Sequence, residues 1–171
     1  MYLSSTAVYG SATDVDENTP AEPSTERARE RLEAERNAAA GPWSTLILRP
    51  AAIYGPERGA HVSLARGAYP IGDNFVSRIH VDDLAAHVEA GLLSSLTGAY
   101  PVADEEPCTT REIAAFWARM TGVAVDPSCA TGRVTGNRRV DGSAIRRALG
   151  ITLAYPSYRT GLLFGTGQGH G

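Results

Sequence analysis

Apolar positions along the chain fall into short continuous runs and into stretches with helical spacing. Residues 46–48 form a continuous apolar run of the kind found in a strand buried on both faces, so a strand is expected over 44–50. Further strands are expected at 1–5 and 98–104. Residues 109–122 place their apolar side chains three and four positions apart, which predicts a helix. Strands that alternate with helices predict an α/β fold with a parallel sheet.

Capping residues and helix breakers delimit other elements. Ser24 or Thr25 can cap a helix that ends near Gly41, and Asp82 is expected to cap a helix that reaches about Leu93. A surface loop is expected over residues 11–24. The remaining expected elements are strands at 74–81 and 138–142 and short helices at 61–67, 143–150 and 155–164.

Composition limits the class of protein. The chain has 171 residues, of which 43% are hydrophobic and 20% charged, which fits one globular domain. The net charge of −3 and the lack of a basic patch give no reason to expect nucleic acid. No apolar run approaches the roughly 18 residues of a membrane span. Cys108 and Cys129 stand far apart and the histidines show no ligand spacing, so we expect a cytoplasmic protein without a metal site.

Four stretches of the sequence together resemble one family. They are YLSSTAVYG, ILRPAAIYGP, SRIHVDDLA and NRRVDGSAIRRALGITLAYPSY. In this order they resemble the later part of an extended short-chain dehydrogenase/reductase, the group of the NAD-dependent sugar-nucleotide epimerases and dehydratases. The resemblance implies that residues 1–171 form part of a Rossmann-like parallel sheet with a small C-terminal substrate-binding lobe. That lobe is expected mainly within residues 54–80 and 98–164.

The family carries a glycine-rich loop after its first strand, which holds the cofactor pyrophosphate at a helix N-terminus. No such loop is found here. The glycines of residues 165–171 follow an expected helix rather than a strand, so a frayed terminus is the better interpretation. We therefore expect the chain to be the C-terminal portion of a longer protein, with roughly 80–100 residues of the nucleotide-binding half missing. The resemblance implies NAD or NADP as cofactor of the full-length form.

The resemblance also points to site residues. Ser5, four residues before Tyr9, corresponds to the hydroxyl that orients the substrate oxygen. The family's YxxxK pair falls on Arg27 and Arg31, and a guanidinium stays protonated at any working pH, so Arg27 cannot exchange a proton as a tyrosine does. The two arginines either contact a phosphate or ribose of the cofactor, or belong to a solvated helix surface. In the second case Arg29 would pair with Glu33, and Arg31 with Glu35.

Other candidates leave two interpretations open. Arg49 either contacts an anionic ligand or pairs with a core carboxylate. Tyr54 is a candidate substrate contact, and either Tyr9 or Tyr54 could replace the missing proton donor, although packing is the better interpretation for both. His80 is expected to be structural, but it could also titrate near pH 6.5. Asp82 and Asp83 are expected to act as a helix cap and a hydrogen-bond anchor.

The predicted function is that of an NAD(P)-dependent nucleotide-sugar epimerase/dehydratase-like protein with a carbonyl or hydroxyl substrate. Two alternatives stay open: a non-catalytic NAD(P)-binding sensor or regulator, and an inactive truncated fragment. The expected partner is a nucleotide sugar or a related small molecule. A homodimer is the oligomer considered.

Overall fold

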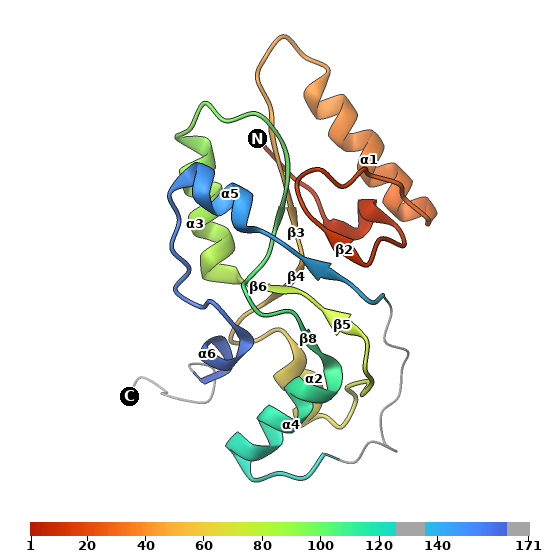
Figure 1. Cartoon of the computed structure of the whole chain (residues 1–171), viewed down its shortest axis with the longest axis vertical. Helices are drawn as coiled ribbons and strands as arrows, with labels where there is room; N and C mark the ends of the chain where they lie inside the picture. Colours follow the sequence, from red (N-terminus) through yellow and green to blue (C-terminus); the bar gives the residue numbers. More distant parts are fainter. Residues whose placement is uncertain (126–135, 164–171) are drawn as a thin grey trace.

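A three-stranded parallel sheet forms the upper part of the molecule in Figure 1. Its strands are β1 (Tyr2–Leu3), β3 (Leu46–Pro50) and β7 (Gly98–Val102), in the order β1-β3-β7. The central strand β3 is buried throughout, as its continuous apolar run predicts. The computed structural model describes residues 1–125 and 136–163. The predicted α/β fold with a partial Rossmann-like sheet is confirmed.

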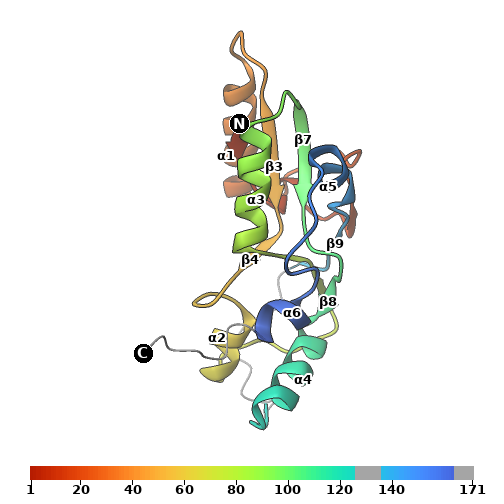
Figure 2. The same cartoon turned by 90° about the vertical axis from the view of Figure 1, so that its left-hand side faces the viewer.

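Helices cover both faces of this sheet. Figures 1 and 2 show α1 (Glu26–Ala39) on one face, with α3 (Val81–Leu92) and α5 (Ser143–Leu149) on the other. Helix α1 begins where predicted, because the Thr25 side chain accepts the backbone N–H of Ala28. Leu48 and Ile145 belong to the apolar cluster between the sheet and the helices α3 and α5, and both are fully buried.

A second apolar cluster lies below the sheet in Figure 1. It is formed around α2 (Ala60–Ala65), α4 (Thr110–Thr121) and α6 (Tyr158–Leu163). Helix α4 has a complete capping box and ends at Gly122 in the left-handed conformation, as its sequence predicts. The ranges predicted for the substrate-binding lobe, 54–80 and 98–164, also include β7 and α5, which pack with the main sheet. The boundary of the lobe therefore stays a prediction.

Several short strands were not foreseen. The predicted strand at 74–81 is two strands, because β5 (Phe75–Val76) pairs antiparallel with β8 (Cys108–Thr109), whereas β6 (Arg78–His80) pairs parallel with β4 (Ala52–Tyr54). The predicted loop at 11–24 contains β2 (Asp14–Val15), which pairs with β9 (Arg139–Val140). A single 3-10 turn, η1 (Thr6–Tyr9), follows β1.

The start of α3 also differs from the prediction. His80 is the N-cap, and its Nδ1 atom accepts the backbone N–H of Asp82 at 3.3 Å. Asp82 is therefore not the cap, and its side chain is mostly exposed. Asp83 is the expected hydrogen-bond anchor: its two carboxylate oxygens accept the N–H groups of Ala154 and Tyr155 at 2.8 and 2.9 Å.

Within residues 1–125 and 136–163, no helix is long and apolar enough to cross a membrane. Cys129 and the glycine-rich residues 165–171 lie outside the described residues.

Candidate functional site

A cavity of about 380 Å³ lies at the carboxyl ends of β1 and β3. In a parallel α/β sheet this is the edge at which ligands bind. Five segments form its walls. These are η1 with its turn (Thr6, Ala7, Gly10), the start of α1 (Ser24, Thr25), residues 51–52 and 75–77, and the segment around β9 (Gly136, Arg138, Val140). We refer to it as the η1 cavity.

Ser5 stands at the start of η1 and is partly buried. Its Oγ atom caps the turn by accepting the N–H of Ala7 at 3.2 Å. Within the described chain, the hydroxyl hydrogen of Ser5 has no acceptor, so it is available to a ligand oxygen. The turn closes at Gly10, whose φ is 56° and where a Cβ atom would lie 2.0 Å from the carbonyl oxygen of Glu22. A glycine at position 10 is therefore a steric requirement of this turn.

A buried polar network lies behind the η1 cavity. Arg49 at the end of β3 forms a forked ion pair with Glu35 of α1, with Nη2–Oε2 at 2.6 Å and Nε within 3.2 Å of both carboxylate oxygens. The Ser4 hydroxyl donates to the same carboxylate. The Arg49 guanidinium also lies 5.0 Å from the ring centre of Tyr9. Arg49 thus pairs with a core carboxylate, one of its two predicted partners, and its contact with a ligand stays a prediction.

Arg27 and Arg31 lie on the flank of α1, beside its buried face. Arg27 is exposed and Arg31 is half-buried. In the part of the chain that the structure describes, neither guanidinium makes a hydrogen bond or an ion pair. The predicted surface pairs are wrong, because Arg29 pairs with Glu26 at 2.8 Å and Glu35 is held by Arg49. Arg27 and Arg31 are therefore two unpaired cations one helical turn apart, and their role with a cofactor stays a prediction.

Neither candidate tyrosine is suited to proton exchange near neutral pH. Burial raises the pKa of the Tyr9 phenol, although Arg49 opposes the rise. Burial also raises the pKa of Tyr54 well above its usual range, and the Tyr54 hydroxyl donates to the Ser157 carbonyl at 3.3 Å. Tyr54 packs in the lower apolar cluster and does not line the η1 cavity. These facts favour the packing interpretation for both residues.

His80 and Cys108 have structural surroundings. The His80 ring stacks at 3.8 Å on Tyr155 and meets the Tyr54 ring edge-on at 5.1 Å. Burial lowers the pKa of His80, which keeps the ring neutral and supports the structural interpretation. Burial raises the pKa of the Cys108 thiol to about 11, so no thiolate forms near neutral pH.

Asp104 was not singled out from the sequence. It follows β7, is 2% exposed, and no described group makes a well-formed hydrogen bond to either carboxylate oxygen. Burial raises its pKa to about 8, although the charge of Arg78 opposes the rise. Asp104 also borders a second cavity of about 440 Å³, whose other lining residues include Asp16 and Arg146. A single aspartate in a loop carries no sequence signal of burial, so reasoning from the sequence could not find it.

Comparison with known proteins supports the class indicated by this fold. No family model matches the chain. A 3-diazoavenalumate denitrifying reductase from Streptomyces sp is 30% identical over 151 residues, which are 76% of this chain and 50% of that protein. A functionally unknown conserved protein from Silicibacter pomeroyi DSS is 36% identical with a TM-score of 0.83, over 96% of this chain and 64% of that one.

Two more solved structures add to this likeness. A candidate NAD-dependent epimerase/dehydratase from Methylobacillus flagellatus is 30% identical with a TM-score of 0.76, over 95% of this chain and 62% of that one. MoeE5, solved with UDP-glucuronic acid and NAD, has a TM-score of 0.79 over 94% of this chain and 61% of its own. At 22% identity it shows the fold alone. The chain thus spans between half and two thirds of the length of these proteins.

The fold and the place of the cavity define a Rossmann-type α/β domain in its later part. The comparisons confirm the resemblance found in the sequence: the chain has the fold of the NAD-dependent epimerases and dehydratases of the short-chain dehydrogenase/reductase type, and it is similar in sequence to such a protein.

Glu35→Gln should destabilise the protein by about 3 kcal/mol, because it leaves the Arg49 cation buried without its counter-ion. Glu33→Gln is the matched control, since Glu33 lies on the exposed side of the same helix, and it should change stability by less than about 0.5 kcal/mol. Urea unfolding measures both. Equal stabilities of the two variants would show that the ion pair does not hold α1 to the sheet.

Asp104→Asn should alter the dependence of stability on pH. Between about pH 4 and pH 8 the unfolded carboxyl loses its proton while the folded one keeps it, so wild-type stability falls as pH rises through this window. The amide cannot titrate and removes this slope, so the variant should gain stability relative to wild type from pH 5 to pH 8, by at most about 1.4 kcal/mol per pH unit. Thermal unfolding across this range measures the difference. A constant difference would mean that Asp104 titrates normally.

Proposed function

We propose that the protein to which this chain belongs binds NAD(P) and acts on a nucleotide sugar or a related carbonyl or hydroxyl compound in the η1 cavity. The observation that carries the proposal is the hydroxyl hydrogen of Ser5, which has no acceptor in the described chain and lies next to Thr6 and Ala7, two residues that line this cavity at the carboxyl edge of a Rossmann-like sheet. When bound, NAD(P) supplies or accepts a hydride. MoeE5, which shares the fold, was solved with UDP-glucuronic acid and NAD.

The described residues fit the parts of such a ligand. Ser5 would donate its hydroxyl hydrogen to the substrate oxygen. Arg27 and Arg31 would contact cofactor phosphate or ribose, because their guanidinium groups are unpaired and suit two-point contacts with phosphate oxygens. Arg49 would act mainly by holding α1 and Ser4 in place, since its own donors are occupied by Glu35. Tyr54 is also a predicted substrate contact, but it does not line the η1 cavity, so it has no part in this proposal.

A second candidate function uses the same cofactor but needs no proton donor from the protein. Arg27 and Arg31 are permanent cations, and burial makes Tyr9 and Tyr54 weaker acids. A substrate that accepts a hydride without a proton from the protein would suit such a site. The curated relative is named as a reductase of a diazo compound, which is consistent with this candidate.

A non-catalytic NAD(P)-binding sensor is the alternative outside enzymology, and an inactive fragment is the alternative for the 171 residues alone. The predicted homodimer and the boundary of the lobe remain part of the proposal. Dinucleotide binding must be tested on the whole protein, because these 171 residues contain no glycine-rich loop between a strand and a helix.

Ser5→Ala separates the enzyme from the sensor. In the whole protein the change should reduce turnover on the order of 100-fold if the hydroxyl orients the substrate, and it should leave NAD(P) affinity unchanged in either case. Reduction or oxidation of the cofactor at 340 nm, followed with a panel of nucleotide sugars and diazo compounds, gives turnover. Wild-type protein that binds cofactor and turns over no compound of the panel would favour the sensor.

Arg27→Gln and Arg31→Gln should each weaken NAD(P) binding about tenfold, the loss of about 1.4 kcal/mol expected for one charge-assisted contact with phosphate. Arg29→Gln removes the same charge from the opposite side of α1, where Glu26 already pairs with it, and should change the affinity less than about twofold. Isothermal titration of the whole protein with NAD and NADP measures the three variants. If all three variants lose the same NAD(P) affinity, Arg27 and Arg31 act only through the general charge of the surface, and the proposed phosphate contacts are wrong.

A further inference from the structure

Arg138 directs three N–H donors of its guanidinium group at one short loop, residues 6–12. Its Nε atom donates to the carbonyl of Ala12 at 3.0 Å, and its two terminal nitrogens donate to the carbonyls of Thr6 and Gly10. Thr6 and Gly10 belong to η1 and its C-cap, and Ala12 follows two residues later; Ser5 is the N-cap of the same turn. The loop and the arginine are 126 to 132 residues apart in sequence. One side chain therefore fixes the backbone that carries the candidate orienting hydroxyl.

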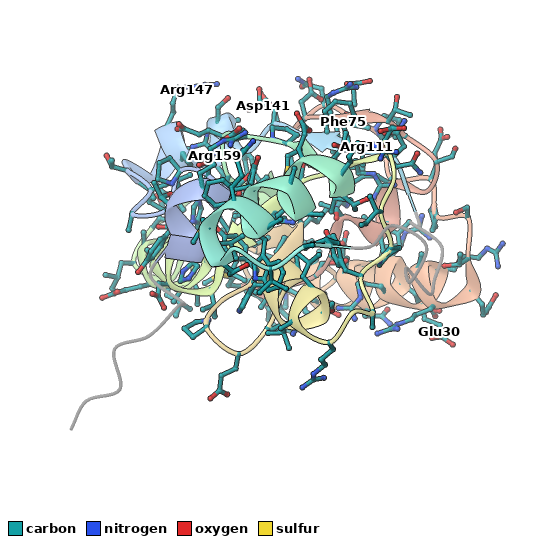
Figure 3. All side chains as sticks on the ribbon, turned by 90° about the horizontal axis from the view of Figure 1, so that it is seen from below. Glu30, Phe75, Arg111, Asp141, Arg147 and Arg159 are labelled. Atoms are coloured by element: carbon teal, nitrogen blue, oxygen red, sulfur yellow. The ribbon has the colours of Figure 1, made fainter. Side chains whose placement is uncertain are left out.

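The backbone of Arg138 is attached to the opposite wall of the η1 cavity. Its N–H donates to the carbonyl of Phe75 in β5 at 2.8 Å, and its carbonyl accepts the hydroxyl of Ser77 at 3.4 Å. Arg138 itself lines the cavity. The residue thus joins the wall formed by η1 to the wall formed by residues 75–77. In Figure 3, which views the molecule from below, Phe75 lies toward the upper edge and Glu30 of α1 toward the lower edge.

The surroundings of Arg138 suit a holding role. It is half-buried, burial lowers its pKa, and in the described parts of the chain no carboxylate pairs with it. Three of its five N–H donors are directed at carbonyl dipoles, whereas Arg27 and Arg31 make no hydrogen bond within the described residues. A lysine has a single nitrogen on a flexible stem, so it cannot reach the three carbonyls from three separate nitrogens as Arg138 does.

We infer that Arg138 is the positioning residue of the site: it holds η1, the turn that Ser5 caps, in the wall of the η1 cavity. The inference rests on the proposed function of this cavity. The adjacent Arg139 plays no such part, because its guanidinium lies 3.6 Å from the ring centre of Phe75 and 3.7 Å from the Asp14 carboxylate, and its side chain is about half exposed.

Arg138→Met in the whole protein tests the inference, with Arg139→Met as the matched loss of charge one residue away. The first measurement is amide hydrogen exchange of Val8, Gly10 and Ala12, whose N–H groups bond within the loop. Exchange should rise at least about tenfold in Arg138→Met and less than about twofold in Arg139→Met, with β3 unchanged in both. Unchanged exchange of the loop in Arg138→Met would overturn the inference whatever the ligand.

The second measurement is titration with UDP-glucuronic acid and with NAD. Arg138→Met should weaken binding of the nucleotide sugar about tenfold or more and leave NAD affinity within about twofold, and added methylguanidinium should restore part of the loss. Faster loop exchange with unchanged sugar binding would overturn the positioning role. If the wild type binds no nucleotide sugar, the proposed substrate class is wrong. The hydrogen-exchange result then decides by itself whether Arg138 holds the turn that Ser5 caps.

Should Arg138→Met fail to fold, Arg138→Lys takes its place, because it keeps the charge and the stem. The same rise in exchange is then expected. A lysine variant with the loop exchange of wild type would show that charge alone, and not the fork, holds the loop, and would overturn the inference.

Discussion

The buried ion pair between Glu35 and Arg49 is the constraint on which the candidate site depends. It fastens α1 to the central strand, and the Ser4 hydroxyl joins the end of β1 to the same carboxylate. Residues four apart in an α-helix are rotated by about 40° relative to one another. Because Glu35 points inward, Arg31 is half-buried and Arg27 is exposed. One buried contact thus sets the direction of the two cations along the flank of the helix.

Local signals explain which elements could be predicted. The start of α1, the start and end of α4 and the burial of β3 follow from a capping threonine, a left-handed glycine and a continuous apolar run. Strands of two residues have no such signal. β2 and β8 exist because a distant segment runs beside them, and propensity reports only on neighbours in sequence.

The candidate site also combines features that local sequence predicts with features that depend on distant segments. The candidates Ser5, Arg27 and Arg31 can be proposed from motifs, because they depend on short spacings. The Glu35–Arg49 pair, the clamp by Arg138 and the burial of Asp104 depend on which segments the fold brings together. Spacing along the helix predicts an ion pair between Arg31 and Glu35. The buried Glu35 carboxylate instead pairs with Arg49, because a buried guanidinium can donate several charge-assisted hydrogen bonds to it. Tertiary contacts override local pairing at this position.

The clamp has a consequence for the order of folding. Its contacts join residues up to 132 apart, and the β2–β9 pair spans a similar separation, so both carry a high cost of loop closure. During synthesis, residues 1–12 leave the ribosome long before Arg138 does, and they must wait for it without their long-range partner. Strand β3 and helix α1 can meet earlier, since 14 residues separate Glu35 from Arg49. The scaffold of the cavity can therefore assemble first, and its final shape is set only when nearly the whole described chain has been made.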